Sequence, residues 1–302
     1  IISTNSVPYG VYASSAYVTI SSVNVDAGEK ITQAGVRVSS WSIISYSSAT
    51  VGDAHGFWLD GSTETAVNYS TAVNNSGTRR AVFLDGGGNN SFTGIYANNG
   101  DPTGQGFYAL GSDTNTVTAS YLRGGTDGVM LGIGSNYNTI SLSTMIGNTF
   151  GLFASGADSN IVTRSYLWGS DSVRLTNDSN YNTISLSTMI GTTSGLFADG
   201  VSSNIVTQSY LWGGQYGAWL DLGGDYNTIS LSTMIGNTLY GLYTNGADSN
   251  TVTQSYMWGA NYGAYLNASS SNTISLSTMI GSAQGGLYVT GSDSNTVTGG
   301  YL

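Results

Sequence analysis

One ten-residue segment, NTISLSTMIG, occurs four times in this chain without a single change. The copies begin at Asn138, Asn182, Asn227 and Asn272. Related segments lie midway between them, for example NIVTRSYLWG from Asn160, so the repeating unit is only half as long. Each unit of 22 to 25 residues holds two short β-rich runs separated by Gly, Asn and Ser, without the apolar spacing of a helix. Such a unit predicts one coil of a solenoid.

Two landmarks define each unit. The first is an Asn that opens the first run, and the second is a Gly followed by apolar and aromatic residues, as in GLFAS from Gly151. The marker asparagines are Asn90, Asn115, Asn138, Asn160, Asn182, Asn204, Asn227, Asn250, Asn272 and Asn295. Looser copies of the glycine landmark reach back to Gly10. We therefore predict a single solenoid domain over 1–302, with about 13 coils and no obvious caps. The coils are expected to be irregular in 1–87 and regular, with a two-coil super-repeat, in 88–302.

The pattern N-x-I-x-x-N-x-I is represented here by Asn138, Ile140, Ser143 and Met145. In this pattern the chain resembles the right-handed parallel β-helix of the pectin-lyase-like group, and in particular its short NosD-type repeats. The resemblance covers residues 88–302 well and 1–87 loosely. It implies an all-β, right-handed parallel β-helix. That fold hosts lyases, hydrolases, tailspikes and purely structural proteins, so the resemblance implies no particular activity.

Two positions of the unit are apolar throughout and are expected to fill the core. With the marker Asn as position zero, position two is Val or Ile from Val117 to Val297, and position seven is Leu or Met from Leu122 to Leu302. Position five is Ser in nearly every unit and suits a tight bend. The marker asparagines are expected to form an amide ladder with ~4.8 Å between coils rather than a catalytic site.

Positions four, six and eight alternate between two residue sets from coil to coil, which indicates that they face outward. Position four alternates between Leu and Arg or Gln, position six between Tyr and Thr, and position eight between Trp and Ile. A second outward column is expected after the glycine landmark, made of Trp58, Phe83, Tyr108, Met130, Phe153, Arg174, Phe197, Trp219, Tyr243, Tyr265 and Tyr288. These columns predict a long exposed apolar surface, which either a partner or the chain's own loops must cover.

Charge and composition exclude several classes of function. The net charge is −10, with only 7 Lys+Arg in 302 residues and no basic cluster, so we expect no nucleic-acid partner. There is no apolar run of about 18 residues, which predicts no membrane insertion. The start, IISTNSVPYG, has neither Met nor a basic segment, so a leader is expected to have been removed. These features favour an extracellular or cell-surface location.

The predicted function is structural. We expect a β-solenoid subunit that stacks head to tail into an extracellular filament and packs laterally through its aromatic columns. The partial coil that stops at Leu302 and the start at Ile1 are expected to complete each other, so the predicted partner is a second copy of the chain. The predicted interface residues are Ile1, Ile2, Val297, Tyr301 and Leu302 at the ends, and Tyr166, Trp168, Tyr210, Trp212, Tyr256 and Trp258 on the side.

The alternative is a carbohydrate-binding or carbohydrate-cleaving β-helix, similar to a pectin lyase or a tailspike, in which Trp and Tyr stack on a polysaccharide. The one compact group of charged residues is Asp53, His55, Asp60, Glu64, Arg79, Arg80 and Asp85. Asp60 and Asp85 follow equivalent landmarks, which would bring two carboxylates together for acid and base roles. No complete catalytic motif is present, so we predict no enzyme activity, no catalytic residue and no cofactor.

A metal site is not predicted either. His55 is the single histidine and there is no Cys, which leaves no His-rich or Cys-rich set of ligands. Asp113, Asp158, Asp248 and Asp293 recur at one turn of the unit. Calcium is one candidate for this row, but capping of the turn by the aspartates is favoured.

Overall fold

The chain is an all-β parallel β-solenoid of about 13 coils. The computed structural model describes residues 5–302, and these residues form strands and turns with no helix. None of them therefore belongs to a helix long and apolar enough to cross a membrane. The predicted fold class and number of coils are confirmed. The chain divides into two compact units, unit 1 (Ile1–Leu152) and unit 2 (Phe153–Leu302).

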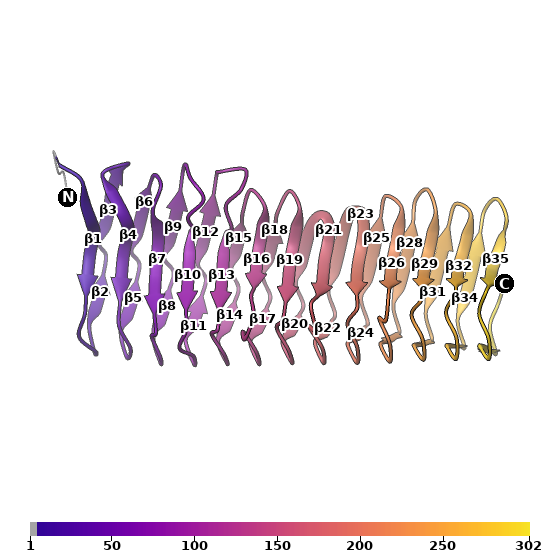
Figure 1. Cartoon of the computed structure of the whole chain (residues 1–302). Helices are drawn as coiled ribbons and strands as arrows, with labels where there is room; N and C mark the ends of the chain where they lie inside the picture. Colours follow the sequence, from indigo (N-terminus) through magenta and orange to yellow (C-terminus); the bar gives the residue numbers. More distant parts are fainter. Residues whose placement is uncertain (1–4) are drawn as a thin grey trace. The chain divides into compact units, whose positions relative to one another are not determined.

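Unit 1 is the less regular of the two. Its strands are β1 (Val7–Ala13), β2 (Thr19–Ser21), β3 (Asn24–Gly28), β4 (Ile31–Val38), β5 (Ile43–Ser45), β6 (Ser48–Val51), β7 (His55–Asp60), β8 (Ala66–Asn68), β9 (Thr71–Asn74), β10 (Val82–Asp85), β11 (Ser91–Thr93), β12 (Tyr96–Asn99), β13 (Phe107–Leu110), β14 (Thr116–Thr118), β15 (Tyr121–Arg123), β16 (Asp127–Leu131), β17 (Thr139–Ser141) and β18 (Thr144–Ile146). Within the unit, successive coils lie side by side (Figure 1).

Unit 2 repeats the same plan with little variation, and β19 contains its first residues. Its strands are β19 (Phe150–Ser155), β20 (Ile161–Thr163), β21 (Tyr166–Thr176), β22 (Thr183–Ser185), β23 (Thr188–Asp199), β24 (Ile205–Thr207), β25 (Tyr210–Gly213), β26 (Tyr216–Asp221), β27 (Thr228–Ser230), β28 (Thr233–Gly236), β29 (Tyr240–Asn245), β30 (Thr251–Thr253), β31 (Tyr256–Gly259), β32 (Tyr262–Asn267), β33 (Thr273–Ser275), β34 (Thr278–Gly281), β35 (Gly285–Thr290) and β36 (Thr296–Thr298).

A regular coil of unit 2 consists of three strands. In the coil that starts at Asn227, β27 holds positions one to three, β28 holds positions six to nine, and β29 carries the glycine landmark. β27 pairs with β24 and β30, β28 pairs with β25 and β31, and β29 pairs with β26 and β32, all in parallel. Each residue therefore lies next to its counterpart in the neighbouring coil, ~4.8 Å along the axis.

Each regular coil turns two sharp corners, and residues with a left-handed backbone make both. In one coil these are Tyr226 (φ 56°) and Leu231 (φ 50°), at positions minus one and four, and in the next they are Ser249 (φ 57°) and Gln254 (φ 50°). A residue other than glycine pays roughly 1–2 kcal/mol for this conformation. The bend predicted at position five is therefore wrong by one residue. Position four makes the bend, and the serine after it turns inward.

Two ladders of polar side chains line the inside of these corners. The Asn227 Oδ1 accepts hydrogen bonds from the Asn204 backbone N (2.9 Å) and Nδ2 (3.1 Å). The Ser232 Oγ accepts a bond from the Ser209 N (3.1 Å) and donates one to the Ser230 carbonyl (2.7 Å). The predicted amide ladder is confirmed. Because the ladders are buried, they satisfy backbone groups that the corners would otherwise leave without partners.

Positions two and seven fill the core, as predicted. In unit 2, Ile229 is 1% exposed and Met234 is 0% exposed, and the equivalent residues of the neighbouring coils are equally buried. Val297 and Leu302, in the last coil, are 39% and 66% exposed, although Val297 is the register partner of the buried Ile274. Burial of these two residues stays a prediction.

The core of unit 1 is built from a different mixture of sizes. Position seven is alanine in three of its coils, at Ala49, Ala72 and Ala97, and all three are buried. Larger rings occupy other core positions, where Phe92 and Phe107 meet edge to face with centroids 5.2 Å apart. Small and large side chains thus compensate each other in unit 1, whereas unit 2 repeats one pair of aliphatic residues per coil.

Candidate functional site

An outward column of side chains follows β4, β7, β10, β13 and β16 in unit 1. Arg37, Trp58, Phe83, Tyr108 and Met130 are register partners in successive coils. The Trp58 and Phe83 rings are 6.3 Å apart, the Phe83 and Tyr108 rings are 5.5 Å apart, and the Arg37 guanidinium lies 4.4 Å from the Trp58 ring. The predicted column is present, but Phe83 and Tyr108 are only 7% and 8% exposed. The prediction of a freely exposed stripe is wrong here, because neighbouring side chains cover the rings.

A second column lies beside these rings, and two of its four members, Gln105 and Asp127, were not predicted from the sequence. It consists of His55, Arg80, Gln105 and Asp127, which come from successive coils. The backbone N of the residue that follows His55 donates to the Arg80 carbonyl, and the same bond joins Arg80 to Gln105 and Gln105 to Asp127. The Arg80 N donates to the His55 Nδ1 (3.2 Å), and the Gln105 Nε2 donates to the Asp127 Oδ2 (3.4 Å). The His55 ring stacks on Phe83 at 4.8 Å. We call these four residues the polar column and the five residues of the preceding paragraph the ring column.

Several atoms of the two columns are buried without a hydrogen-bond partner in the protein. They are the Trp58 Nε1, the Arg80 Nε, the Gln105 Oε1 and the Asp127 Oδ1. Each such group costs about 1–3 kcal/mol in lost hydration. Native proteins contain few of them, so four in neighbouring positions of one site point to a role that offsets the cost.

The environment of the polar column changes the charge of its members. Burial, followed by the charges of Arg79 and Arg80, lowers the pKa of His55 to about 3, so the imidazole is neutral at neutral pH. Burial raises the pKa of Asp127 to about 7, although the hydrogen bond from Gln105 acts in the opposite direction. The site therefore combines a neutral imidazole with a carboxyl group that titrates near neutral pH.

Positive charge also collects at this site. Arg37 forms an ion pair with Asp60. The Arg79 Nη1 lies 3.4 Å from the His55 Nε2, and the Arg80 guanidinium lies against the ring column. Among residues 5–302, neither Arg79 nor Arg80 forms a salt bridge. Three of the seven basic residues of the chain thus lie at this site, where Asp60 and Asp85 offset part of their charge.

The charged group predicted from the sequence is assembled only in part. His55, Arg79 and Arg80 come together, as described. Asp60 and Asp85 are register partners in adjacent coils, as expected, but Asp60 is engaged by its ion pair. The two carboxylates therefore differ in their partners.

The remaining two members of that group do not join the site. Asp53 packs so closely against Gly77 that a side chain at Gly77 would collide with its carboxylate. Glu64 stands exposed on a left-handed corner with φ 55°. Acidic residues at both places are explained by the local turns rather than by a shared site.

The repeat itself points to Gln105 and Asp127. Like His55, each stands directly before a landmark glycine, a position that the sequence-based prediction did not use. Tyr216 and Tyr240 hold the same place in unit 2.

The predicted lateral interface residues form one outward face of unit 2, which we call the Tyr-Trp face. Its tyrosines and tryptophans are Tyr166, Tyr210 and Tyr256, which are 40%, 38% and 38% exposed, and Trp168, Trp212 and Trp258, which are half-buried. Strand register places a coil with Thr and Ile after each coil with Tyr and Trp. The predicted alternation is confirmed, and the role of the face as an interface stays a prediction.

The predicted terminal interface is only partly described. Val297, Tyr301 and Leu302 are 39%, 68% and 66% exposed. Ile1 and Ile2 lie outside the described residues. Head-to-tail stacking therefore stays a prediction.

The recurring aspartates act on the turns beside them. The Asp113 Oδ1 accepts a hydrogen bond from the Asn136 N (2.6 Å), and the Asp248 Oδ1 accepts one from the Ser270 N (2.6 Å). Each carboxylate thus caps the equivalent turn of a neighbouring coil. Residues 5–302 contain no group of three His, Cys, Asp or Glu side chains placed to hold a metal ion.

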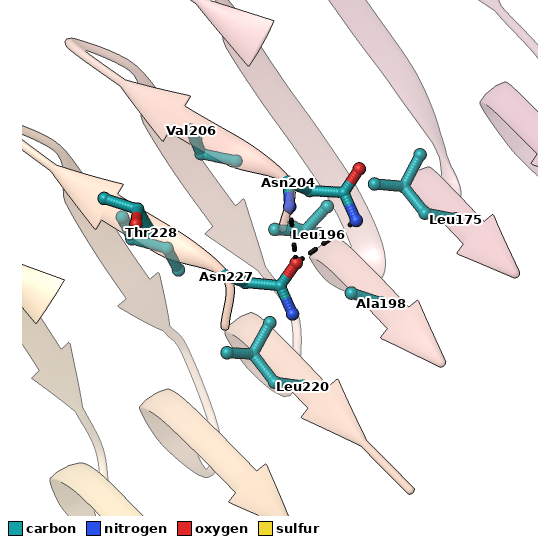
Figure 2. Close-up of a pocket in the computed structure, with 9 residues that line it drawn as sticks. Leu175, Leu196, Ala198, Asn204, Val206, Leu220, Asn227 and Thr228 are labelled. Atoms are coloured by element: carbon teal, nitrogen blue, oxygen red, sulfur yellow. Dashed lines mark hydrogen bonds between the residues drawn. The ribbon is translucent and has the colours of Figure 1, made fainter. Parts of the chain in front are cut away.

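An internal cavity lies between the walls of the coils in unit 2 (Figure 2). It is lined by Leu175, Leu196, Ala198, Asn204, Val206, Leu220, Asn227, Thr228 and Ile229. Apolar side chains form most of the lining, and the bond from Asn204 to Asn227 forms its polar edge. Because nearly all of these side chains are buried, we interpret the cavity as a packing gap in the core rather than as a ligand site.

Sequence comparison identifies the family. The family described as "Periplasmic copper-binding protein (NosD)" matches residues 93–237 and 170–302. The chain belongs to the NosD family. No curated protein matches this NosD-family chain.

Solved structures share the fold of this NosD-family protein at low identity. The Dettilon tailspike protein is similar over 93% of this chain and 62% of its own, with 11% identity and a TM-score of 0.64. The A-module of the Azotobacter vinelandii mannuronan C-5 epimerase AlgE6 is similar over 96% of this chain and 87% of its own, with 10% identity and a TM-score of 0.52. A mutant of the periplasmic alginate epimerase AlgG is similar over 98% and 79%, with 12% identity and a TM-score of 0.53.

Copper, named in the family description, does not fit the donors of this chain. Copper sites use imidazole and thiolate or thioether ligands. The protein has one histidine, whose Nδ1 already accepts a bond from the Arg80 N, and no cysteine. Met145, Met189 and Met234 are 0% exposed in the apolar core. The described residues therefore offer no accessible set of copper ligands.

Proposed function

We propose that this NosD-family protein binds an acidic polysaccharide outside the cytoplasm, and that the polar and ring columns of unit 1 hold the sugar. The observation that carries this proposal is the group of four buried polar atoms without protein partners, next to a stack of aromatic rings. A sugar complements both features, because its hydroxyl groups both donate and accept hydrogen bonds while its C–H faces pack on rings. Trp58, which is half-buried, offers the accessible ring face, since Phe83 and Tyr108 are only 7% and 8% exposed.

The arginines indicate the charge of the ligand. Arg79 and Arg80 form no salt bridge among the described residues, and burial lowers the pKa of Arg80 although the charge of Asp85 acts in the opposite direction. A carboxylate on the sugar would pair with these charges through a planar pair of hydrogen bonds, which guanidinium groups favour. A neutral sugar would lack this pairing.

The comparisons support a polysaccharide ligand only indirectly. The similar solved folds include a tailspike, a mannuronan epimerase and an alginate epimerase, and the family is described as periplasmic. Identities of 10–12% show the fold alone. The choice of ligand therefore rests on the site of this chain.

Binding can be measured by isothermal titration with a panel of polyuronates and matched neutral glucans. We expect the polyuronates to bind more tightly and their affinity to fall with salt, since charge contributes to it. The double variant Arg79→Gln/Arg80→Gln should weaken polyuronate binding at least about tenfold, which corresponds to the loss of one charge-assisted hydrogen bond. Arg123→Gln removes an exposed charge elsewhere in unit 1 and serves as the matched control. Equal binding of both polymer classes, or of neither, would contradict the proposal.

A second candidate function is proton transfer on the bound sugar. The observation that favours it is Asp127, which is 2% exposed and has a pKa of about 7, a range suited to a general acid or base. The sequence-based prediction of no turnover stays a prediction. If incubation with polyuronates changes their chain length or sugar composition, Asp127→Asn should abolish the change while leaving binding in place. Unaltered polymer would exclude this candidate and leave the binding proposal intact.

Self-assembly into a filament, the function predicted first from the sequence, remains a separate proposal. It concerns the chain ends and the Tyr-Trp face, neither of which contributes to the polar column. The two functions therefore do not compete for the same residues.

A further inference from the structure

We propose that the Tyr-Trp face of unit 2 binds a second copy of the chain in an antiparallel pair, with the large side chains of each copy fitting between those of the other. The face covers six consecutive coils, on β21, β23, β25, β28, β31 and β34. At positions six and eight these coils carry Tyr and Trp, then Thr and Ile, in strict alternation.

Because large and small side chains alternate, the face has regularly spaced projections and notches. Coils are ~4.8 Å apart, so the large pairs recur every ~9.6 Å and a shallow notch lies beside each of them. The three tyrosines are 38–40% exposed. Thr188 and Ile190 form one notch, and Thr233 and Ile235 form the next.

Symmetry decides how two such faces fit. A two-fold axis perpendicular to the solenoid, placed between the third and fourth coils, puts the first coil of one copy opposite the sixth coil of the other. Trp212 then lies opposite the partner's Ile235, and Trp168 lies opposite the partner's Ile280. Every large coil meets a small one, because the face contains an even number of coils. A two-fold axis parallel to the solenoid would instead place large side chains opposite large ones.

The chemistry of the face suits a second copy rather than a charged ligand. Positions six and eight carry no charge on any of the six coils. Position four beside them alternates in the opposite phase, with Leu186, Leu231 and Leu276 on the small coils and Arg164, Gln208 and Gln254 on the large ones. In the antiparallel pair each leucine lies opposite a long Arg or Gln side chain, whose methylene groups can pack on it. The face is only a few side chains wide, so the complex is expected to be weak and to dissociate on dilution.

Thiol cross-linking tests the arrangement, because the chain has no cysteine of its own. In the double variant Tyr166→Cys/Thr278→Cys, the two cysteines are five coils apart within one chain, ~24 Å, which is beyond the reach of a bis-maleimide that spans about 10 Å. In the antiparallel pair each one faces the other cysteine of the partner across a gap of about 10 Å, the usual spacing of two packed sheets, which is too wide for a disulfide. We expect the full 302-residue chain to give a covalent dimer with two cross-links.

The matched control is the single variant Tyr166→Cys. In the antiparallel pair its cysteine lies five coils, ~24 Å, from its counterpart in the partner, so covalent dimers should be at least about tenfold rarer. Equal trapping by both variants would indicate random collision and would overturn the antiparallel register. Circular dichroism of the reduced proteins verifies that both variants are folded.

A second measurement separates shape from general stickiness. Ile235→Trp adds apolar area but fills a notch, so sedimentation at rising concentration should show weaker association than for the unchanged protein. Stronger association would mean that the face attracts any apolar surface, and the proposal would be wrong. The proposal would also be wrong if the protein stays monomeric at high concentration and binds a neutral glucan through this face. Loss of that glucan binding after Trp168, Trp212 and Trp258 are changed to Ala would assign it to the face. None of these outcomes depends on the polar column of unit 1.

Discussion

The same position of the coil serves two purposes in the two units. Directly before the landmark glycine, unit 1 carries His55 and Asp127 among its polar column, whereas unit 2 carries the buried Ser194 in one coil and Tyr216, Tyr240 and Tyr262 in the three coils that follow it. The tyrosines of unit 2 contact one another, with Tyr240 and Tyr262 centroids 6.0 Å apart, and none of them leaves a buried polar atom without a partner. Burial of His55 and Asp127 in unit 1 costs free energy, because it removes their polar groups from water. The repeated backbone thus supplies equivalent positions, and local substitutions decide whether a position stabilises the fold or binds a ligand.

The internal ladders of polar side chains are also more uniform in unit 2 than in unit 1. In unit 2 the marker asparagine of a coil accepts bonds from the asparagine of the preceding coil, as Asn227 does from Asn204. In unit 1 the equivalent positions begin with Ser42 and Thr65, where the Ser42 N donates to the Thr65 Oγ1 at 3.4 Å. A hydroxyl cannot supply the second bond that an amide supplies. Unit 2 is therefore the more uniform unit, and substitutions in it should follow simple rules.

The largest effect is expected when a charge is introduced into the regular core. Ile229→Asp places a carboxylate where the side chain is 1% exposed, which should lower the free energy of unfolding by about 5 kcal/mol or more. Denaturant titration followed by circular dichroism measures this loss. Gln254→Asp, at an exposed left-handed corner that Asp tolerates, should change stability by less than about 0.5 kcal/mol. Similar stability of both variants would contradict the inward assignment.

Next in size is the effect of pH on unit 1. The pKa of Asp127 is raised from 3.8 to about 7, so the folded state holds a proton that the unfolded state releases. The stabilisation is complete below pH 4 and is lost as the pH rises through 7, by at most about 4 kcal/mol. Asp127→Asn should remove this part of the pH dependence and be the more stable protein at pH 8.

Asp171 in unit 2 also has a raised pKa and contributes a slope of the same sign. The informative quantity is therefore the difference between the unchanged protein and Asp127→Asn, measured from pH 4 to pH 8 at constant ionic strength. Parallel curves would show that Asp127 does not carry this proton.

A smaller effect is expected from one rung of the amide ladder. Asn227→Ala removes the acceptor of two hydrogen bonds from Asn204 and the donor to the Val201 carbonyl, and should cost about 2–4 kcal/mol. The equivalent change in unit 1, Thr65→Ala, removes a hydroxyl with weaker bonds and should cost about 1 kcal/mol. Equal losses would remove the distinction that we draw between the ladders.

The smallest effect concerns a corner. Leu231 has φ 50° and is 51% exposed, so Leu231→Asn should raise stability by about 0.5–1 kcal/mol because Asn adopts this conformation more easily. The matched change in unit 1 is Gly94→Ala, where φ is 61° and an added Cβ would lie 2.8 Å from the Tyr69 ring. That change should lower stability by about 1 kcal/mol or more. Thermal unfolding of both variants gives the two signs directly.

Periodicity explains why so much of the fold could be predicted. Inward residues such as Ile229 and Met234, and the ladder of Asn204 and Asn227, occupy the same place in many coils, so each is in effect observed several times in one sequence. A β-solenoid translates that repetition directly into register. The same reasoning placed Trp58, Phe83 and Tyr108 in one column.

The candidate site could be predicted only in part, because it departs from the repeat. The Phe83 ring is covered by the His55 ring and the Arg80 guanidinium. Both residues occupy a position of the coil whose residue type changes from one coil to the next. The pairing of Asp60 with Arg37 and the burial of Asp127 likewise depend on side-chain directions that spacing does not determine. The position of the bend was missed by one residue because nothing in Leu231 or Gln254 favours a left-handed backbone.

The left-handed corners have a consequence for what the solenoid can display. Position four holds Ala119, Leu142, Arg164, Gln208 and Gly299 in different coils, all with positive φ. Since the cost is set by the backbone and most of these side chains extend into solvent, one non-glycine residue there can replace another at a cost within about 1 kcal/mol. Within each unit the corner is thus an edge of interchangeable attachment points at steps of ~4.8 Å. Cysteines placed at chosen steps of one unit would turn that unit into a molecular ruler for dyes, metal clusters or peptide epitopes.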